Sequence, residues 1–222
     1  ANRSSSDALA HGDTYIEYFT YTVSDGNGST DEGELAITIT GVGPVGSNDT
    51  ASVNENVLLD VNAAGGVLAN DTGGDTESLA VTNISSNSTG NNGNATQGVL
   101  GTYGTLTVAA DGSYTYTPNT AAAEALDAND PATDVFTYTV KDDDDKNSST
   151  ATLTISITGQ DDNPVGNNDT GAVNEDATVQ VNQASGVLAN DTDADASSTL
   201  TVSAISGGSV GSALNGTYGQ LT

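Results

Sequence analysis

Residues 101–117 read GTYGTLTVAADGSYTYT, and this stretch decides the fold class. On both sides of Asp111-Gly112, apolar or aromatic residues alternate with threonine. A period of two is typical of a β-strand with one buried face. The Asp-Gly pair between the two runs is a hairpin turn signal. The stretch therefore predicts a β-hairpin that places one face in a hydrophobic core.

The same alternation continues in both directions along the chain. Strands are separated by about 8–12 residues, with Gly, Asn and Asp between them, which favours an all-β sandwich of the Greek-key type. One run, AAAEAL at 121–126, predicts a helix of about one or two turns. The further predicted strands are 15–23, 34–40, 57–61, 79–84, 135–140, 151–158, 179–181, 200–205 and 219–222.

Several of these segments occur twice, in the same order. A spacing of about 115–120 residues is the length of a whole domain, so the chain is predicted to contain one domain in tandem. The repeated segments are FTYTV at 19–23 and 136–140, GVLANDT at 66–72 and 186–192, and GTYGTLT at 101–107 with GTYGQLT at 216–222.

Two prolines mark the predicted module boundaries. Pro44 and Pro164 each follow a predicted strand that ends in Thr-Gly, and each precedes the start of a new module. Residues 1–43 are then the C-terminal part of one repeat, residues 44–163 a complete Ig-like repeat, and residues 164–222 the N-terminal part of the next.

The chain is thus expected to be nearly two repeats, divided in the middle of a module. Three interpretations stay open: a fragment of a long array, the averaged repeat of a filament, or partial modules that complete each other head to tail by strand addition. The absence of a starting Met favours a piece of a longer protein.

The charge balance excludes several classes of partner. The chain has 30 acidic residues and 3 basic ones, for a net charge of −27. Nucleic acid binding needs a basic surface, which the sequence lacks, and no apolar run is long enough for membrane insertion. Such self-repulsion calls for counter-ions, and divalent cations are the obvious candidates. The absence of Cys excludes disulfides and fits a bacterial extracellular protein stabilised by ions.

The repeat resembles a known family. Its segments run PVGNNDT, VNEDATVQV, GVLANDTDADASSTLTV, GTYGTLTVAADGSYTYTP, DVFTYTVKDDDD and ATLTISITG. Together they look like the cadherin-like, bacterial Ig-like repeats called VCBS repeats, found in giant RTX-type adhesins and other bacterial surface proteins. The resemblance implies a secreted or cell-surface β-sandwich, often made rigid by Ca²⁺, that extends an adhesin from the cell.

The strongest candidate metal ligands are Asp191, Asp193 and Asp195, in a D-x-D-x-D pattern. Alternating carboxylates in a loop can converge on one hard cation. The pattern is not an EF-hand, because it lacks the Gly that the loop needs at its sixth position, and Val202 stands where it needs Glu. The alternative is a solvated acidic turn, and the family resemblance favours Ca²⁺.

The first copy of this loop reads NDTGGDTE and differs in its acids. It keeps Asp71 and Asp75, has Gly73 in place of the middle Asp, and adds Glu77. Fewer carboxylates predict a weaker Ca²⁺ site, unless Glu77 substitutes for the missing one.

The segments that join the modules differ as well. The second, GQDDNP, carries Asp161 and Asp162, whereas the first, GVGP, carries no acid. The resemblance implies that such linker acids combine with Asp169 and Glu175 of the following module, so the second junction is the better candidate for a bridging ion.

Four further acids are weaker candidates. Asp49 and Glu55 are the equivalents of Asp169 and Glu175 at the first junction. Asp142 aligns with Asp25 in the loop after the FTYTV strand, where the alternative is an exposed hairpin tip.

The leading functional prediction is a structural extender of a Ca²⁺-stabilised adhesin or surface filament. One alternative is a filament subunit that polymerises head to tail with identical chains by strand complementation. Another is a module that binds surface glycans or proteins. An enzyme is not expected, and no catalytic residue is predicted, because no acid–base pair or nucleophile recurs in the repeat.

Overall fold

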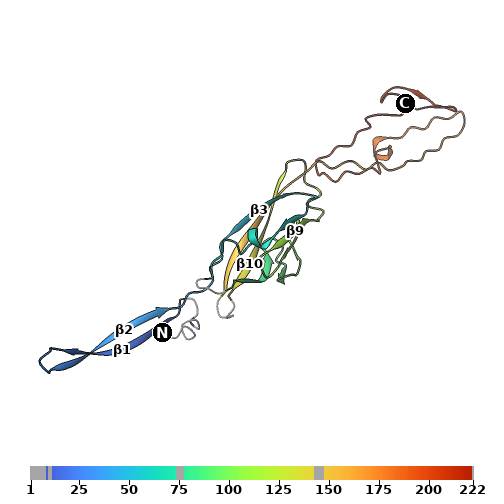
Figure 1. The fold of residues 1–222 in the computed structure, drawn as a ribbon. Coiled ribbons are helices and arrows are strands. Elements are labelled where there is room, and N and C mark those ends of the chain that lie inside the picture. The colour runs from blue at the N-terminus through green and yellow to red at the C-terminus, as the bar shows by residue number, and fades with distance from the viewer. Residues whose placement is uncertain (1–8, 10–11, 74–77, 143–147, 222) are drawn as a thin grey trace.

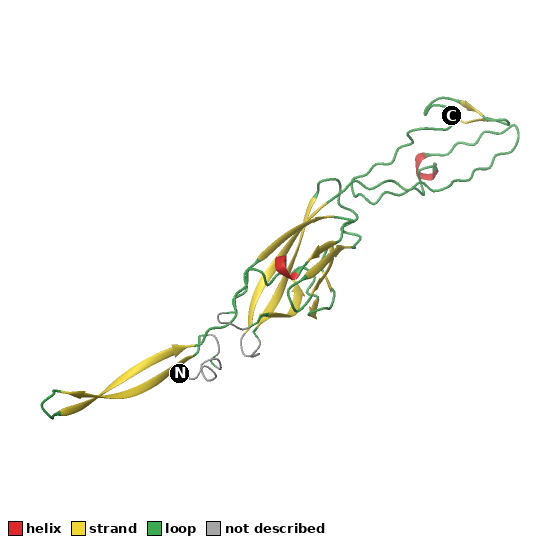
Figure 2. Ribbon diagram, viewed as in Figure 1, coloured by secondary structure: helices red, strands yellow, loops and turns green. Residues whose placement is uncertain are grey.

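The structure is a computed structural model that describes residue 9 and residues 12–73, 78–142 and 148–221. Asp75 and Glu77 therefore lie outside the described residues. Figure 1 shows an elongated arrangement in which a hairpin, a sandwich and a C-terminal segment follow one another. Strands dominate, and the helices are single short turns (Figure 2). Among the described helices, none has the length and apolar character needed to cross a membrane.

Two sheets form the sandwich, which we define as residues 49–158. In the described residues the first has five strands in the order β3-β11-β10-β5-β6, and the second has four in the order β4-β9-β8-β7. The strands of the first are β3 (Asp49–Asn54), β5 (Ala80–Ser86), β6 (Asn92–Asn94), β10 (Pro131–Lys141) and β11 (Ser148–Thr158). Those of the second are β4 (Leu59–Val61), β7 (Val99–Leu100), β8 (Gly104–Val108) and β9 (Tyr114–Pro118). The predicted β-sandwich is confirmed.

Alternation along the strands builds one core between the two sheets. Every second residue of β10 and β11 is buried over most of their length, as the period of two requires. Tyr116 of β9 meets Phe136 of β10 edge to face, with ring centroids 6.2 Å apart, so the sheets touch through aromatic rings. The largest fully buried apolar side chains are Tyr116, Tyr138, Phe136, Ile84, Leu106, Leu153, Ile155 and Ile157.

One carboxylate is buried inside this core. Asp134 of β10 is 1% exposed and accepts hydrogen bonds from the backbone N–H groups of Thr102, Tyr103 and Gly104, at 2.8–3.1 Å. The hydroxyl of Tyr116 donates to it at 2.7 Å. Four donors satisfy the charge, so Asp134 fixes the GTYG turn against the opposite sheet.

The N-terminal hairpin consists of β1 (Thr14–Ser24) and β2 (Thr30–Thr40), paired antiparallel over their whole length. At its tip, Asp25 accepts the N–H groups of Asn27 at 2.8 Å and Ser29 at 3.0 Å. The apolar residues of this hairpin are largely exposed, in contrast to those of β10 and β11.

The C-terminal segment, residues 164–221, repeats local features of the sandwich. Asn182 accepts the N–H of Ser185 at η2 (Gln183–Ser185), as Asn62 accepts that of Gly65 at η1 (Ala63–Gly65). It also contains β12 (Leu214–Asn215) and β13 (Gln220–Leu221). The strands predicted at 179–181 and 200–205 are not formed. In the sandwich, β4 pairs with β9 and β5 with β10, and the described structure gives 179–181 and 200–205 no such partners.

The helix predicted at 121–126 is wrong. These residues form turns, in which Ala123 and Glu124 both donate to the carbonyl of Thr120. Six residues are too few to offset the cost of helix nucleation. Ala123 is instead fully buried and anchors the loop on the sandwich.

Candidate metal centre

A buried glutamate follows the end of β3. This strand runs parallel to β11 until Asn54 lies opposite Thr158. The N–H of Glu55 then donates to the carbonyl of Thr158 at 3.0 Å, and Oε1 of Glu55 accepts the N–H of Gln160 at 2.5 Å. Glu55 is 0% exposed. The pairing of β3 with β11 therefore places this carboxylate at the start of the segment that leaves the sandwich.

Two aspartates approach the same place from the other side. The N–H of Asp162 donates to Oδ2 of Asp195 at 3.0 Å. The N–H of Asp195 in turn donates to Oδ1 of Asp193 at 3.0 Å, which orients the loop.

The loop that holds Asp195 also contacts the sandwich directly. The N–H of Ala196 donates to the carbonyl of Ala125 at 3.3 Å. Ser197 donates its N–H to Oδ1 of Asp127 at 3.1 Å. Backbone N–H groups of Asp162, Ala196 and Ser197 thus hold the Asp195 loop against the sandwich and the linker.

We call Glu55, Asp162 and Asp195 the junction cluster. One carboxylate oxygen from each lies within 4.8 Å of the other two. Oε2 of Glu55, Oδ2 of Asp162 and Oδ1 of Asp195 are all buried, and none has a hydrogen-bond partner in the described structure. Buried polar atoms are nearly always paired, so these three carboxylates form the candidate cation site among the described residues.

The electrostatics of the junction cluster are unfavourable without a cation. Burial raises the pKa of Glu55 above its ordinary value, and repulsion from Asp162, Glu124 and Asp195 raises it further, while the N–H of Gln160 acts in the opposite direction. Lys141 is the basic residue that the structure describes, and it is the last residue of β10. The first residue of that strand, Pro131, pairs with Thr158 beside the junction cluster, so Lys141 lies at the far end of the strand.

The donor set fits a hard divalent cation. Ca²⁺ takes about 6–8 oxygen ligands at about 2.3–2.6 Å, so oxygens on opposite sides of the ion lie up to about 5 Å apart. The 4.8 Å spread of the junction cluster agrees with this limit. Carboxylates alone, with no thiolate or imidazole, are ligands for Ca²⁺ or Mg²⁺ rather than for zinc.

The predicted D-x-D-x-D set divides between different roles. Asp195 enters the junction cluster, and Asp193 supports it through a backbone hydrogen bond. Asp191 instead accepts the N–H of Asn167 at 2.6 Å. The same bond joins Asp71 to the N–H of Ser47 at 2.6 Å in the first copy.

The grouping expected at the second junction differs from the one in the structure. Asp162 meets Glu55 of the sandwich, whereas Asp161, Asp169 and Glu175 are exposed and lie outside the cluster found among the described residues. The reason is strand direction. The residue after β3 lies beside the end of β11, so this glutamate lies beside the segment that follows the sandwich.

A second pair of acids surrounds the hydroxyl of Tyr138. Asp49 Oδ2 lies 2.8 Å from it and Asp71 lies 3.3 Å from it, with the carbonyls of Ser47 and Val67 both at 2.9 Å. One hydroxyl hydrogen serves all these acceptors. Burial raises the pKa of Asp49 and of Asp71, and in Asp49 the hydrogen bond from Tyr138 acts in the opposite direction. Burial therefore disfavours the charged form of both carboxylates.

The remaining candidates occupy separate places. Asp142 follows β10 and is 4% exposed. The carboxylate of Asp25 is exposed, and the N–H bonds from Asn27 and Ser29 lower its pKa, which describes a stabilised turn. The proposed ligand roles of these two residues stay predictions.

Sequence reasoning ranked Glu55 low and did not single out Glu124 or Gln160. A signal was available for Glu55, which is the last residue of VNE and directly follows the first strand after Pro44. Glu55 lies beside the segment that follows the sandwich because β3 pairs in parallel with β11. The alternation pattern of the sequence does not specify that pairing.

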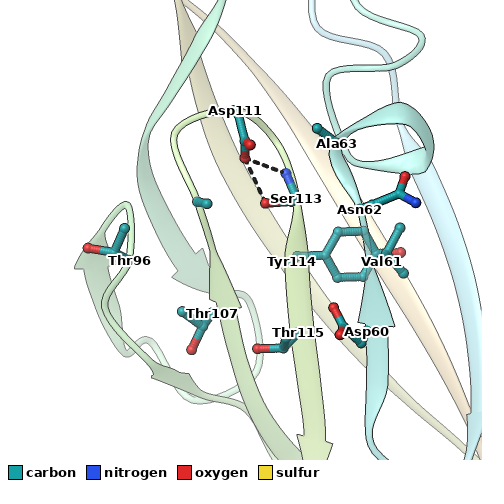
Figure 3. Close-up of a pocket in the computed structure, with 11 residues that line it drawn as sticks. Asp60, Val61, Asn62, Ala63, Thr96, Thr107, Asp111, Ser113, Tyr114 and Thr115 are labelled. Atoms are coloured by element: carbon teal, nitrogen blue, oxygen red, sulfur yellow. Dashed lines mark hydrogen bonds between the residues drawn. The ribbon is translucent and has the colours of Figure 1, made fainter.

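A surface hollow lies beside β4 and β9 (Figure 3). Its acidic residue Asp111 accepts the hydroxyl of Ser113 at 2.6 Å and its N–H at 3.1 Å, and these bonds lower the pKa of Asp111. The carboxylate is therefore used in the β8–β9 turn, and the hollow presents threonines, Asn62, Asp60 and Tyr114 without a convergent set of charges.

The fold and the junction cluster define an acidic β-sandwich with three clustered carboxylates at one end. The chain belongs to the bacterial cadherin-like domain family, which matches residues 42–159. The chain is also similar to the calcium-binding lectin RapA2 of Rhizobium johnstonii, with 31% identity over 161 residues. That match covers 69% of this chain and 64% of the relative.

One solved structure is similar over part of its length. An endo-fucoidan hydrolase, MfFcnA4, from glycoside hydrolase family 107, matches 69% of this chain and 19% of its own, at 16% identity and a TM-score of 0.29. This likeness carries no argument about fold or function.

Proposed function

We propose that the chain is a structural module of a bacterial extracellular adhesin, in which Ca²⁺ at the junction cluster fixes one repeat against the next. The cadherin-like family and the calcium-binding lectin relative support a surface-adhesion role and a non-catalytic one. The strongly acidic composition supports an ion-stabilised protein outside the cell.

The observation that carries the proposal is the position of the three unpaired carboxylate oxygens. Glu55 belongs to the sandwich, Asp162 to the segment that leaves it, and Asp195 to the C-terminal segment. An ion held by all three would connect parts of the chain that otherwise share only a few backbone hydrogen bonds. Calcium would supply the positive charge that this site lacks.

The side chains have distinct parts in this mechanism. Glu55 is held by the N–H of Gln160 and offers its second oxygen to the junction. Asp195 is held by the N–H of Asp162 and does the same from the other side. With the charges uncompensated, the carboxylates repel one another, and the junction is expected to bend or open.

Small-angle X-ray scattering tests the proposal. In millimolar Ca²⁺ we expect the chain to have one well-defined maximum dimension. In EGTA we expect a broader distribution of dimensions that includes bent shapes. Glu55→Gln should resemble the EGTA state even in Ca²⁺, because it removes one ligand charge. Asp60→Asn is the matched control, since Asp60 is exposed on β4. Identical scattering in all four cases would contradict the proposal.

A second candidate function is glycan binding, which the relative's description as a calcium-binding lectin favours. In this chain, Tyr218 is fully exposed in a Gly-flanked turn, where an aromatic ring can stack on a sugar. A glycan array with wild type and Tyr218→Ala tests it. Equal signals from both proteins, or none from wild type, would remove Tyr218 as a sugar contact.

A further inference from the structure

The side chain of Asn56 lies beside the junction cluster, between two acidic residues. Asn56 directly follows Glu55, which belongs to the cluster. One end of its amide group lies 3.5 Å from Oδ1 of Asp162, which also belongs to the cluster. The other end lies 3.1 and 3.3 Å from the two carboxylate oxygens of Glu124. The amide therefore connects the junction cluster to an acid outside it.

One orientation of this amide suits Glu124. An amide donates through its nitrogen and accepts through its oxygen, and the surrounding partners decide which end is which. With the oxygen towards Glu124, acceptors face one another and no hydrogen bond forms. With the NH₂ group towards Glu124, the nitrogen donates to both carboxylate oxygens. The amide oxygen then occupies the end that lies 3.5 Å from Oδ1 of Asp162.

The place of this oxygen fits a ligand of the ion that the junction cluster would hold. Bonds of about 2.3–2.6 Å to Ca²⁺ put neighbouring ligand oxygens about 3–4 Å apart. The separation of 3.5 Å from Asp162 lies in that range. The three carboxylates of the cluster already carry one more negative charge than a divalent cation neutralises. An amide oxygen supplies a further ligand and adds no charge.

We propose that Asn56 is a fourth ligand of the cation at the junction cluster, through its amide oxygen, and that Glu124 is a positioning residue that holds the amide in the ligating orientation. The inference rests on the proposed Ca²⁺ site and adds two residues to it. Asn56 is exposed and Glu124 is half-buried, whereas Glu55 is fully buried. Asn56 therefore covers the ion from the solvent side.

The backbone conformation at Asn56 does not by itself account for an asparagine. Its φ is +61°, in the left-handed region, which Asn and Asp adopt more readily than most residues. Asp176, at the matching position of the C-terminal segment, has the same φ of +61°. Asn129 has a φ of +69°, and among the described residues its side chain makes no hydrogen bond to Glu124 or to the cluster. The contacts of its amide thus distinguish Asn56.

Glu124 acts on the junction cluster through its charge as well. Repulsion from Glu124 contributes to the raised pKa of Glu55, so the two carboxylates interact although Glu124 lies outside the three-carboxylate group. The hydrogen bonds from the NH₂ group of Asn56 give Glu124 a partner and leave the amide oxygen for the ion. Outer-shell partners of this kind orient metal ligands and tune the affinity of a site.

Europium luminescence tests the ligand role, because it counts the water molecules bound to the ion. Eu³⁺ is a hard cation that replaces Ca²⁺ at oxygen sites, and its decay rates in H₂O and D₂O give the number of coordinated waters. We expect Asn56→Gly to show about one water more than wild type, since a water takes the place of the amide oxygen. Glycine adopts a positive φ without strain. Asn56→Asp keeps an oxygen at this place and should keep the wild-type water count.

Asn129→Gly is the matched control, because Asn129 is an exposed asparagine of positive φ and should leave the water count unchanged. Equal melting temperatures in EGTA verify that the variants fold. Glu55→Gln identifies the emission that comes from the junction cluster when Eu³⁺ is kept below one equivalent.

Two negative results have different meanings. Wild-type emission that Glu55→Gln does not change would contradict the cation site, and this inference with it. Emission that depends on Glu55, with equal water counts in wild type and Asn56→Gly, would overturn the ligand role of Asn56 and leave the cation site standing.

Calcium titration calorimetry tests the positioning role of Glu124. Glu124→Gln removes the charge and keeps an acceptor oxygen for the amide of Asn56, whereas Glu124→Leu removes both. We expect the dissociation constant of Glu124→Leu to be about tenfold higher than that of Glu124→Gln. In the Asn56→Gly background the two should bind Ca²⁺ equally, because no amide is left to hold. Equal affinities in the wild-type background, or the same difference in both backgrounds, would overturn the positioning role.

Discussion

The backbone N–H of Asp162 donates to Oδ2 of Asp195 at 3.0 Å, while Oδ2 of Asp162 and Oδ1 of Asp195 remain buried and unpaired. The contact positions the two residues, yet it leaves their charges facing each other and Glu55. Geometry that is fixed by backbone donors, with charge left uncompensated, is the arrangement expected of a cation site.

Calcium should raise the melting temperature of this chain. Binding to the folded state alone stabilises by about 2.7 kcal/mol at 100 times the dissociation constant. For a domain of about 100 residues this corresponds to roughly 10–20 °C. Differential scanning calorimetry in Ca²⁺, in Mg²⁺ and in EGTA measures it. A rise of equal size in Mg²⁺ would show that the stabilisation is not specific to Ca²⁺.

Removing the charge of Asp195 should act in opposite directions with and without Ca²⁺. In EGTA, Asp195→Asn relieves repulsion with Glu55 and Asp162, and we expect stabilisation of about 1 kcal/mol. In Ca²⁺ the same variant should be less stable than wild type, because the ion loses a ligand. Asp161→Asn removes one charge from the same linker at an exposed position and should show neither effect. Thermal melts of both variants in Ca²⁺ and in EGTA measure these effects. A shift of the Asp195→Asn melting temperature with the same sign and size in both conditions would contradict the site.

Acid should weaken Ca²⁺ binding at a pH above the ordinary range of glutamate. Burial raises the pKa of Glu55 above its ordinary value of about 4.5, so the folded protein binds a proton more tightly than the unfolded chain. The stability of the metal-free protein therefore falls as pH rises through this window, and the affinity for Ca²⁺ rises. Burial raises the pKa of Asp49 and Asp71 in the same direction.

Calcium titrations at several values between about pH 4 and pH 7 test this behaviour. A dissociation constant that stays constant over the range would mean that no carboxylate with a raised pKa binds the ion.

The buried Asp134 should matter for stability and not for Ca²⁺. Asp134→Ala leaves three backbone N–H groups and the Tyr116 hydroxyl without their acceptor, and hydrogen bonds to a charged group contribute about 1.5–3 kcal/mol. Tyr116→Phe removes one of these bonds and should cost less. Denaturant unfolding measures both. A loss of Ca²⁺ affinity without a loss of stability would assign Asp134 a different role.

The strands of the sandwich could be predicted because alternation and turn chemistry are local properties. The run before Asp111 and the run after it became β8 and β9, and the FTYTV segment at 136–140 lies within β10. The C-terminal copy has the same local pattern at 179–181 and 200–205 but forms no strands there. A strand depends on a partner, which a local pattern does not reveal.

The junction acids show a similar division. Asp162 and Asp195 could be chosen from acidic runs next to a predicted boundary. Their meeting with Glu55 depends on the parallel pairing of β3 with β11, a contact between residues about 100 positions apart. The role of Tyr138 beside Asp49 and Asp71 was also beyond the sequence, because a tyrosine in a strand reads as a core residue.

Isothermal titration calorimetry of wild type and Glu55→Gln tests the central claim most directly. Glu55→Gln keeps the size of the side chain and the acceptor for the N–H of Gln160, and it removes only the charge at the junction cluster. We predict that the variant binds one Ca²⁺ fewer than wild type, or binds that ion with a dissociation constant at least about tenfold higher, a change of about 1.4 kcal/mol. Equal stoichiometry and equal affinity in the two proteins would contradict the assignment of Ca²⁺ to Glu55, Asp162 and Asp195.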